Sequence, residues 1–358
     1  MHPCQKNGKG KKKNRRPQSL VGPPVVVKPV DECAWLGEIF EHCLPAFGAA
    51  YLRRIYLILR RAIMENVPLV LAIAGPITVS NQHRAWLIPL LKTGWVAYIT
   101  TTDAVCYHDG HDSLHKFKKR PIHSVELFGD DAEYRKHGII RVTDTGFSEK
   151  ILLEQDRMIS AVLERPEFQK KMTTTERNHR LGYYYAAQEE KFGVPPGLLS
   201  TCANLGIPVH IGAPADGSIF LNSLKLWTLK KLGSKRLKDY AFDYDLHADV
   251  FESCSYHYWG LFHSEAKALG AAVLGGGTSK NYSLQPEPML SQLFFLSDIR
   301  GYDYDVQIVS SPVTDGSLSS CFPAEAVSWG KVNPETYRYA TESLQCDYSI
   351  VMPFLVKA

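Results

Sequence analysis

Apolar and polar positions along the chain follow two patterns, one typical of helices and one typical of buried strands. Residues 34–65 place apolar side chains at helical spacing among several arginines. The run 67–74 is apolar throughout and ends at a glycine, which is typical of a strand covered on both faces. Ser80 and Asn81 are then expected to cap a helix that runs through Leu91.

The alternation of strands and helices continues to the C-terminus. Further strands are expected at 96–102, 207–211, 271–274, 306–309 and near Cys346, and helices near 149–163, 175–191 and 323–329. Strands separated by helices predict an α/β fold with a doubly wound, mostly parallel, Rossmann-like sheet and right-handed crossovers. Residues 110–200 are more polar and helical, and we expect them to pack on the sheet as an insertion.

Charge separates an N-terminal tail from the rest of the chain. The chain has 41 lysines and arginines against 37 acidic residues, but eight of the basic ones precede Asp31, the first acid, which leaves 33. We therefore predict a disordered basic tail at 1–30 and a single α/β domain at 31–358. The acidic body makes nucleic acid an unlikely partner. The tail is interpreted as a solvated arm, with a weak tether for RNA or an acidic partner as the alternative.

Neither a membrane segment nor a secretory signal is expected. The longest apolar run, Val67 to Val79, contains two prolines and is shorter than the ~20 residues that span a bilayer. The eight cysteines are scattered without a C-x-x-C pair, which is typical of reduced thiols in the cytoplasm and argues against a structural zinc site.

Glycines, hydroxyls and carboxylates follow five of the predicted strands. Ligands of open α/β sheets bind beyond the carboxyl ends of strands, where glycines admit phosphates and carboxylates bind ribose hydroxyls. Each signal alone is equally compatible with a plain turn, and their repetition is what favours a nucleotide site. The candidates are Thr78, Ser80, Thr102, Asp103, Asp216, Ser310, Ser311 and Asp315.

Three histidines form the pattern H-x-x-H-x-x-x-H at His108, His111 and His115. On one helix they would share a face and resemble a metal site. Gly110 interrupts such a helix, so separate histidines are the favoured interpretation and no metal is expected.

The most distinctive local string is P-A-E-A-V-S-W-G-K at 323–331. Lys331 follows Trp329 and Gly330, and partial burial there would lower its pKa and make its amine a nucleophile for imine chemistry. The alternative is a surface lysine at the end of a helix, where the helix dipole favours cations.

The string 325–331 closely resembles the active-site motif of deoxyhypusine synthases. Other motifs of that family recur in the same order, at 207–218, 273–281, 315–317 and 346–355. The resemblance covers about 35–358 and is weakest at 110–200. It implies a doubly wound α/β fold and a homotetramer with sites at subunit interfaces.

The chemistry that the resemblance implies uses NAD to oxidise spermidine. The aminobutyl unit then forms a Schiff base on an enzyme lysine and passes to a lysine of an initiation factor, where NADH reduces it. Plant homospermidine synthases resemble the same family and pass the unit to putrescine instead.

The resemblance also assigns roles to residues. Lys331 matches the Schiff-base lysine, Glu325 and Trp329 match substrate contacts, and Gly276 matches a glycine beside the substrate. Positions that resemble NAD contacts are Thr102, Asp216, Ser310, Ser311, Asp315 and Asp347. Carboxylates among them favour NAD over NADP.

The chain departs from the family pattern at positions that bind the ammonium groups of spermidine. Tyr107 and His108 stand where a tandem acidic pair is expected, as in the bacterial deoxyhypusine synthase-like branch. Leu221 and Leu318 replace expected aspartates, and Asn281 replaces an expected histidine. We therefore expect a changed amine pocket in which Tyr107, His108 and Asn281 contact the substrate.

These observations predict an NAD-dependent transferase that moves an aminoalkyl group from a polyamine-type donor through an imine on Lys331. Glu325 would orient or deprotonate an amine. The acceptor is a protein lysine or, alternatively, a diamine, as in homospermidine synthases. A non-catalytic relative that binds NAD or a polyamine is the third possibility.

Overall fold

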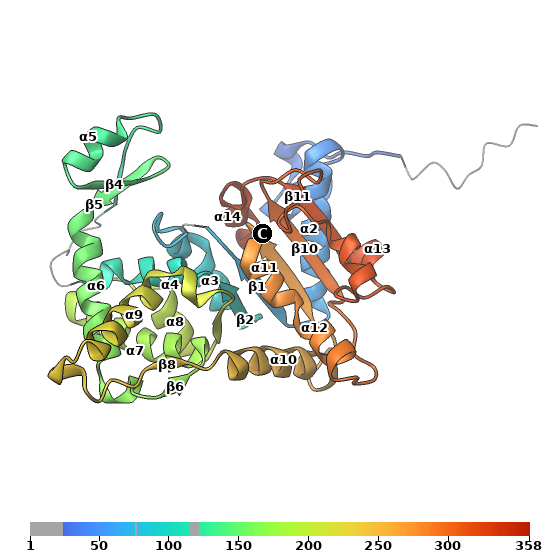
Figure 1. Cartoon of the computed structure of the whole chain (residues 1–358). Coiled ribbons are helices and arrows are strands. Elements are labelled where there is room, and N and C mark those ends of the chain that lie inside the picture. Colours follow the sequence, from blue (N-terminus) through green and yellow to red (C-terminus); the bar gives the residue numbers. More distant parts are fainter. Residues whose placement is uncertain (1–23, 76, 115–121) are drawn as a thin grey trace, which may run out of the picture.

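The computed structural model describes residues 24–75, 77–114 and 122–358, so most of the predicted basic tail and His115 lie outside the described residues. At its centre is a six-stranded sheet in the order β11-β10-β9-β1-β2-β7, with every neighbouring pair parallel (Figure 1). The six strands are β1 (Leu69–Ile73), β2 (Val96–Thr101), β7 (Val209–Ile211), β9 (Gly270–Leu274), β10 (Tyr304–Val309) and β11 (Thr341–Gln345).

This strand order reverses between β1 and β9, the first and fourth strands of the sheet in sequence. It is the order of the doubly wound nucleotide-binding folds, and it confirms the predicted fold class. From β1 the chain continues to β2 on one side, and from β9 it continues to β10 on the other side. A crevice at this point is where such sheets bind ligands.

Both faces of the sheet are buried, as the apolar strand runs predict. Leu69, Leu71 and Ile73 of β1 pack into the main core, whereas Val70 between them belongs to a second cluster with Tyr98 and residues on the opposite face. Successive strand residues therefore enter different cores, which is why the run is apolar without alternation.

Helices cover these faces. The N-terminal and C-terminal parts of the chain supply α1 (Leu36–His42), α2 (Phe47–Met64), α3 (Ile88–Leu91), α11 (Gly277–Leu284), α12 (Pro286–Pro288), α13 (Tyr337–Ala340) and α14 (Tyr348–Lys357). The middle of the chain supplies α4 (Asp103–Asp109), α6 (Glu149–Leu163), α7 (Thr174–Phe192), α8 (Leu198–Leu205), α9 (Ser218–Lys231) and α10 (Leu246–Phe262). A two-stranded pair, β6 (Lys171–Met172) and β8 (Asp243–Tyr244), lies among them.

Two predicted helices differ from the observed ones. The helical pattern of 34–65 is two helices, because Pro45 lies between α1 and α2. Ser80 and Asn81 do not cap a helix: they lie in a turn, and a π-helical segment His83–Leu87 leads into the short α3. The 323–329 segment is a 3-10 helix, Pro323–Trp329.

A small antiparallel sheet within the middle of the chain was not predicted. Strands β3 (Ile122–Ser124), β5 (Thr145–Ser148) and β4 (Ile139–Val142) pair in that order beside α5 (Asp131–Lys136), at the upper left of Figure 1. A two-residue turn, Thr143 and Asp144, joins β4 to β5. Short strands with mixed polar positions lack a strong period, which is why the sequence indicated only helix here.

Among the described residues, no helix is long and apolar enough to cross a membrane.

Candidate active site

A cavity of about 460 Å³ lies where the strand order reverses. Its walls come from the carboxyl ends of β1, β9, β10 and β11 and from the start of α14. The volume falls within the ~300–1,000 Å³ of small-molecule sites. The fold therefore forms its crevice at the place where doubly wound sheets bind nucleotides.

Two glycines bring bare backbone to this cavity. Gly75 has φ +101° and Gly275 has φ +86°, which L side chains rarely adopt. A Cβ at Gly275 would lie 2.9 Å from the Ala74 carbonyl oxygen, and one at Gly75 would lie 3.1 Å from the Tyr348 hydroxyl. These positions allow a close approach of the backbone, as a phosphate-bearing ligand requires.

Three of the predicted cofactor residues line the cavity, namely Ser80, Ser310 and Asp347. The Asp347 carboxylate caps α14 by accepting a hydrogen bond from the Ser349 amide at 2.8 Å. The turn of the unpredicted hairpin, Thr143 and Asp144, lines the same cavity. Sequence reasoning missed this turn because its strands were not recognised.

Two other predicted cofactor residues are engaged inside the protein. The Thr78 hydroxyl is buried and donates to the Val105 carbonyl at 2.8 Å. The Asp103 carboxylate pairs with the Arg177 guanidinium at 2.7 Å, and both side chains are almost fully buried. The structure therefore uses Thr78 and Asp103 as internal contacts and brings neither into the cavity.

The remaining predicted cofactor residues lie around the same end of the sheet without lining the cavity. Thr102 is half-buried at the start of α4, Asp216 is exposed, and Ser311 is half-buried. Asp315 is exposed and accepts hydrogen bonds from the amide and hydroxyl of Ser317 at 3.1 and 2.9 Å. The motif at 315–317, Asp-Gly-Ser, is thus a local turn in this conformation.

Replacing Asp103 with alanine is expected to lower the free energy of unfolding by ~3–5 kcal/mol, because Arg177 would keep a buried charge without its partner. Chemical denaturation followed by circular dichroism measures this. Asp216→Ala, which removes an exposed carboxylate, is the control and should change stability by less than ~0.5 kcal/mol. Equal effects of the two variants would contradict the role of the pair.

Lys331 follows the 3-10 helix and is half-buried. Its Nζ lies 5.8 Å from the centroid of the Trp329 ring. Burial lowers the pKa of Lys331, while Cys321 and Glu287 oppose that shift. A lysine with a depressed pKa beside an aromatic ring has the properties of an amine nucleophile.

Lys280, the other lysine near a glycine motif, is almost fully buried. Its Nζ donates to Gln307 Oε1 and to the Cys321 carbonyl, both at 2.6 Å. Burial raises the pKa of the neighbouring Asp305 to about 7, and Lys280 opposes that shift. With two of its hydrogen bonds already made to the protein, Lys280 is a poor nucleophile.

Glu325, Asn281 and Gly276 are the other residues predicted to act with Lys331. Glu325 is exposed on the 3-10 helix, and Asn281 is half-buried on α11. Gly276 has φ +80°, and a Cβ there would lie 2.8 Å from the Ser319 side chain. Gly276 therefore allows the 310–321 loop to pack closely against the end of β9.

Glu287, on α12, is a buried carboxylate next to the Gly330 turn that sequence reasoning did not single out. It is 5% exposed, and its Oε2 has no hydrogen-bond partner in the described structure. A Cβ at Gly330 would lie 2.7 Å from that oxygen, so the carboxylate packs directly against the residue before Lys331. The only available signal was a lone glutamate between two prolines, with no spacing that ties it to Lys331.

Tyr107 and His108 lie on α4, among residues of α6 and of the small sheet. The Tyr107 hydroxyl donates to Asp156 Oδ1 at 2.9 Å, and His108 Nδ1 lies 3.0 Å from His111 Nε2. Burial lowers the pKa of His108 to about 4, so its ring is neutral at neutral pH. Within this chain the structure does not bring these two residues to Lys331.

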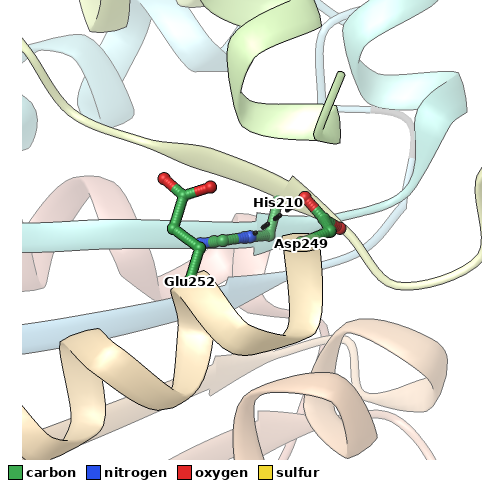
Figure 2. A group of neighbouring side chains, drawn as sticks. All are labelled: His210, Asp249 and Glu252. Carbon is green, nitrogen blue, oxygen red and sulfur yellow. Dashed lines mark ion pairs between the residues drawn. The ribbon is translucent and has the colours of Figure 1, made fainter. Parts of the chain in front are cut away.

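One cluster among the described residues has the composition of a metal site. His210 on β7 lies between Asp249 and Glu252 of α10, with potential ligand atoms within 4.8 Å of one another (Figure 2). Thr174 and Tyr282 donate hydrogen bonds to Asp249, and Thr175 donates to Glu252 at 2.6 Å. Hydroxyl donors thus satisfy both carboxylates, and the cluster joins α7, α10 and α11 to the edge strand.

Comparison with known proteins gives a consistent result. The family model for deoxyhypusine synthase matches residues 36–358. A "Deoxyhypusine synthase-like protein" of Thermosynechococcus vestitus is 33% identical over 345 residues, which cover 95% of this chain and 82% of that protein. "Probable deoxyhypusine synthase 1" of Methanosarcina acetivorans is 25% identical over 321 residues, or 89% of this chain and 88% of that protein.

A solved structure shares the fold. A crystal structure from Entamoeba histolytica, described as a deoxyhypusine synthase, superposes with a TM-score of 0.53 at 13% identity. The match covers 92% of this chain and 94% of that chain.

Proposed function

Because this chain belongs to the deoxyhypusine synthase family, whose members are transferases of aminoalkyl groups, we propose that it passes an aminoalkyl unit from a polyamine-type donor through an imine on Lys331 to an amine acceptor. NAD is the proposed cofactor, and the cytoplasm is the proposed location. The environment of Lys331 is the observation that carries the proposal. Its half-buried amine lies beside Trp329 within the family motif, with a pKa that burial lowers.

The cavity at the strand ends fits a dinucleotide in its chemistry. Bare backbone at Gly75 and Gly275 suits phosphates, and Ser80, Ser310 and Asp347 offer partners for ribose and amide groups. NAD, when bound, supplies the hydride acceptor that converts the donor amine to an imine and the hydride that reduces the product.

The residues of the chain perform the transfer itself. The Lys331 amine attacks the imine carbon of the oxidised donor, a carbon–nitrogen bond forms, and the other amine of the donor leaves with a proton. The acceptor amine then attacks the carbon held on Lys331 and releases the lysine. The Trp329 ring lies beside Nζ, with its centroid at 5.8 Å, and the partial burial of Lys331 keeps the amine less solvated.

The protein is expected to bind NAD at least tenfold more tightly than NADP, a difference of ~1.4 kcal/mol. The carboxylates of Asp144 and Asp347 line the cavity and would repel a 2′-phosphate. Titration calorimetry with both nucleotides measures the ratio. Asp144→Asn should lower the ratio, whereas Glu133→Gln on α5 removes an exposed charge outside the cavity and should leave it unchanged. A tenfold preference for NADP would contradict the assignment.

Mass spectrometry of the protein mixed with NAD and candidate polyamines tests the proposal as a whole. Trapping of a reduced adduct on Lys331 supports a transferase and argues against a purely binding relative. A screen of protein and diamine acceptors then separates protein modification from diamine synthesis of the homospermidine synthase type. We also propose a homo-oligomer, a tetramer by family resemblance, in which Tyr107 and His108 of one subunit approach Lys331 of another.

A further inference from the structure

We propose that Glu287 is the acid–base partner of Lys331, which carries protons between the lysine nitrogen and the group that departs. The inference rests on the proposed function, because it assumes that Lys331 forms an imine. It assigns to α12 a part in the chemistry that the local sequence around Glu287 does not indicate.

The geometry of the Gly330 turn supports this assignment. Gly330 has φ +78°, and it leaves space that Glu287 occupies, since any Cβ would meet Oε2 at 2.7 Å and the carboxyl carbon at 3.0 Å. The glycine directly before Lys331 thus lets the Glu287 carboxylate pack against the backbone of that turn. In this conformation the carboxylate acts on the Lys331 amine through its charge and forms no ion pair with it within 4.0 Å. Ser291 partly opposes the rise that burial causes in the pKa of Glu287, and Oε2 is buried without a hydrogen-bond partner in the described structure. A buried acceptor left open one residue before the proposed nucleophile calls for an explanation, and proton exchange or substrate binding would supply one.

Other titratable groups near Lys331 are less suited to this role. Burial raises the pKa of the Cys321 thiol, so it remains protonated at neutral pH. Lys280 donates hydrogen bonds to Gln307 and to the Cys321 carbonyl, which keep its amine engaged with the protein. Glu325 is exposed, and its charge acts on Cys321 and Lys280.

Burial raises the pKa of Glu287 and lowers that of Lys331, so their proton affinities approach each other. A smaller difference in proton affinity lowers the cost of a proton transfer between an acid and a base. The two directions are consistent with a partner that takes a proton and returns it within one cycle.

The proton balance can be followed with a simple aldehyde. The Lys331 nitrogen attacks the carbonyl carbon of butanal, and a carbon–nitrogen bond forms. Glu287 moves each of the two amine hydrogens in turn to the carbonyl oxygen, the carbon–oxygen bond breaks, and water leaves. The imine forms without a net change in Glu287, and cyanoborohydride then reduces it to a stable adduct.

Removing the Glu287 charge distinguishes a purely electrostatic role from acid–base catalysis, because the two roles change the trapping rate in opposite directions. The Glu287 carboxylate raises the pKa of Lys331, so Glu287→Gln should lower that pKa and leave more free amine at neutral pH. If Glu287 acted only through its charge, the variant would trap butanal faster. An acid–base partner predicts the opposite, a loss of ~10²-fold in rate.

The experiment measures the rate of butanal trapping on Lys331 in the full chain, by peptide mass spectrometry with cyanoborohydride, from pH 5 to 9. Both proteins should lose rate at low pH as Lys331 becomes protonated. Wild type should show a further fall, from protonation of Glu287, that Glu287→Gln lacks, and Glu287→Asp should recover part of the rate. Glu335→Gln, which removes an exposed carboxylate four residues after Lys331, should behave as wild type.

Two glycine variants test whether a slower rate in Glu287→Gln comes only from misfolding. Gly330→Ala pushes the carboxylate away and should also slow trapping. Gly233→Ala imposes similar backbone strain, because Gly233 has φ +85°, but its Cβ would have no neighbour within 4 Å. This variant should not slow trapping. A Glu287→Gln or Gly330→Ala variant that traps as fast as wild type overturns the inference while leaving the role of Lys331 intact. Wild-type protein that traps nothing on Lys331 overturns the proposed function and the inference with it.

Discussion

Replacing Lys331 with alanine is expected to reduce imine trapping from the natural reaction to background. No other described lysine combines a half-buried amine, an aromatic neighbour and a pKa that burial lowers within the E-A-V-S-W-G-K context. Without a nitrogen nucleophile the carbon–nitrogen bond to the enzyme cannot form. Borohydride reduction during turnover, followed by peptide mass spectrometry, measures the adduct on each lysine.

Lys280→Met is the matched comparison for Lys331→Ala. Its side chain has a similar volume, but two hydrogen bonds of a buried ammonium are lost, each worth ~1.5–3 kcal/mol. We expect lower thermal stability and an adduct on Lys331 that is reduced by no more than a few-fold in the folded protein. Trapping that survives in Lys331→Ala and disappears in Lys280→Met would mean that the nucleophile is misassigned.

Spermidine is expected to be a poor donor, weaker by at least a hundredfold than a secondary amine with fewer terminal charges. The acids that the family pattern expects are replaced by Tyr107, His108, Leu221 and Leu318, and Asn281 replaces an expected histidine. His108 is neutral at pH 7 because burial lowers its pKa to about 4, and Leu221 and Leu318 carry no charge. Two or three lost charge-assisted hydrogen bonds correspond to ~3–9 kcal/mol of binding.

The donor series that tests this compares N-butylpropylamine, N-butyl-1,3-propanediamine and spermidine by kcat/KM. Leu318→Asp restores the acid that the family pattern expects and should improve spermidine relative to the other two. Leu229→Asp places a charge on α9 at similar exposure and should not. Spermidine turnover equal to that of the less charged amines would show that the pocket recognises both ammonium groups by other means.

The amine half of the site illustrates how far a motif alone can lead. The string that contains Lys331 and Trp329 predicts the candidate nucleophile, because one short segment supplies both the amine and the ring. Glu287 belongs to a different segment, separated from Lys331 by β10 and the 310–321 loop. Its proximity depends on how α12 packs against the turn at Gly330, and no local pattern encodes that packing.

At the proposed cofactor cavity, too, the sequence predicted the location, and the tertiary structure decided which residues line it. Strand ends rich in glycine and hydroxyl residues predicted the edge of the sheet at which the cavity forms, since parallel strands bring their carboxyl ends together. Which residues reach the cavity depended on other contacts. Asp103 follows β2 as predicted, yet Arg177 of α7 draws its carboxylate inside, and Asp144 enters from a hairpin in the middle of the chain.

The sequence by itself determined the class of the fold and the identity of the candidate nucleophile. Apolar runs bounded by glycines specify buried parallel strands, and their alternation with helices specifies a doubly wound sheet, because both are patterns of near neighbours. Only the tertiary structure decided which polar side chains are internal partners and which face the site. Burial and pairing depend on residues that are far apart in the chain, so Asp103 with Arg177 and Glu287 beside Gly330 became visible only once the helices were packed on the sheet.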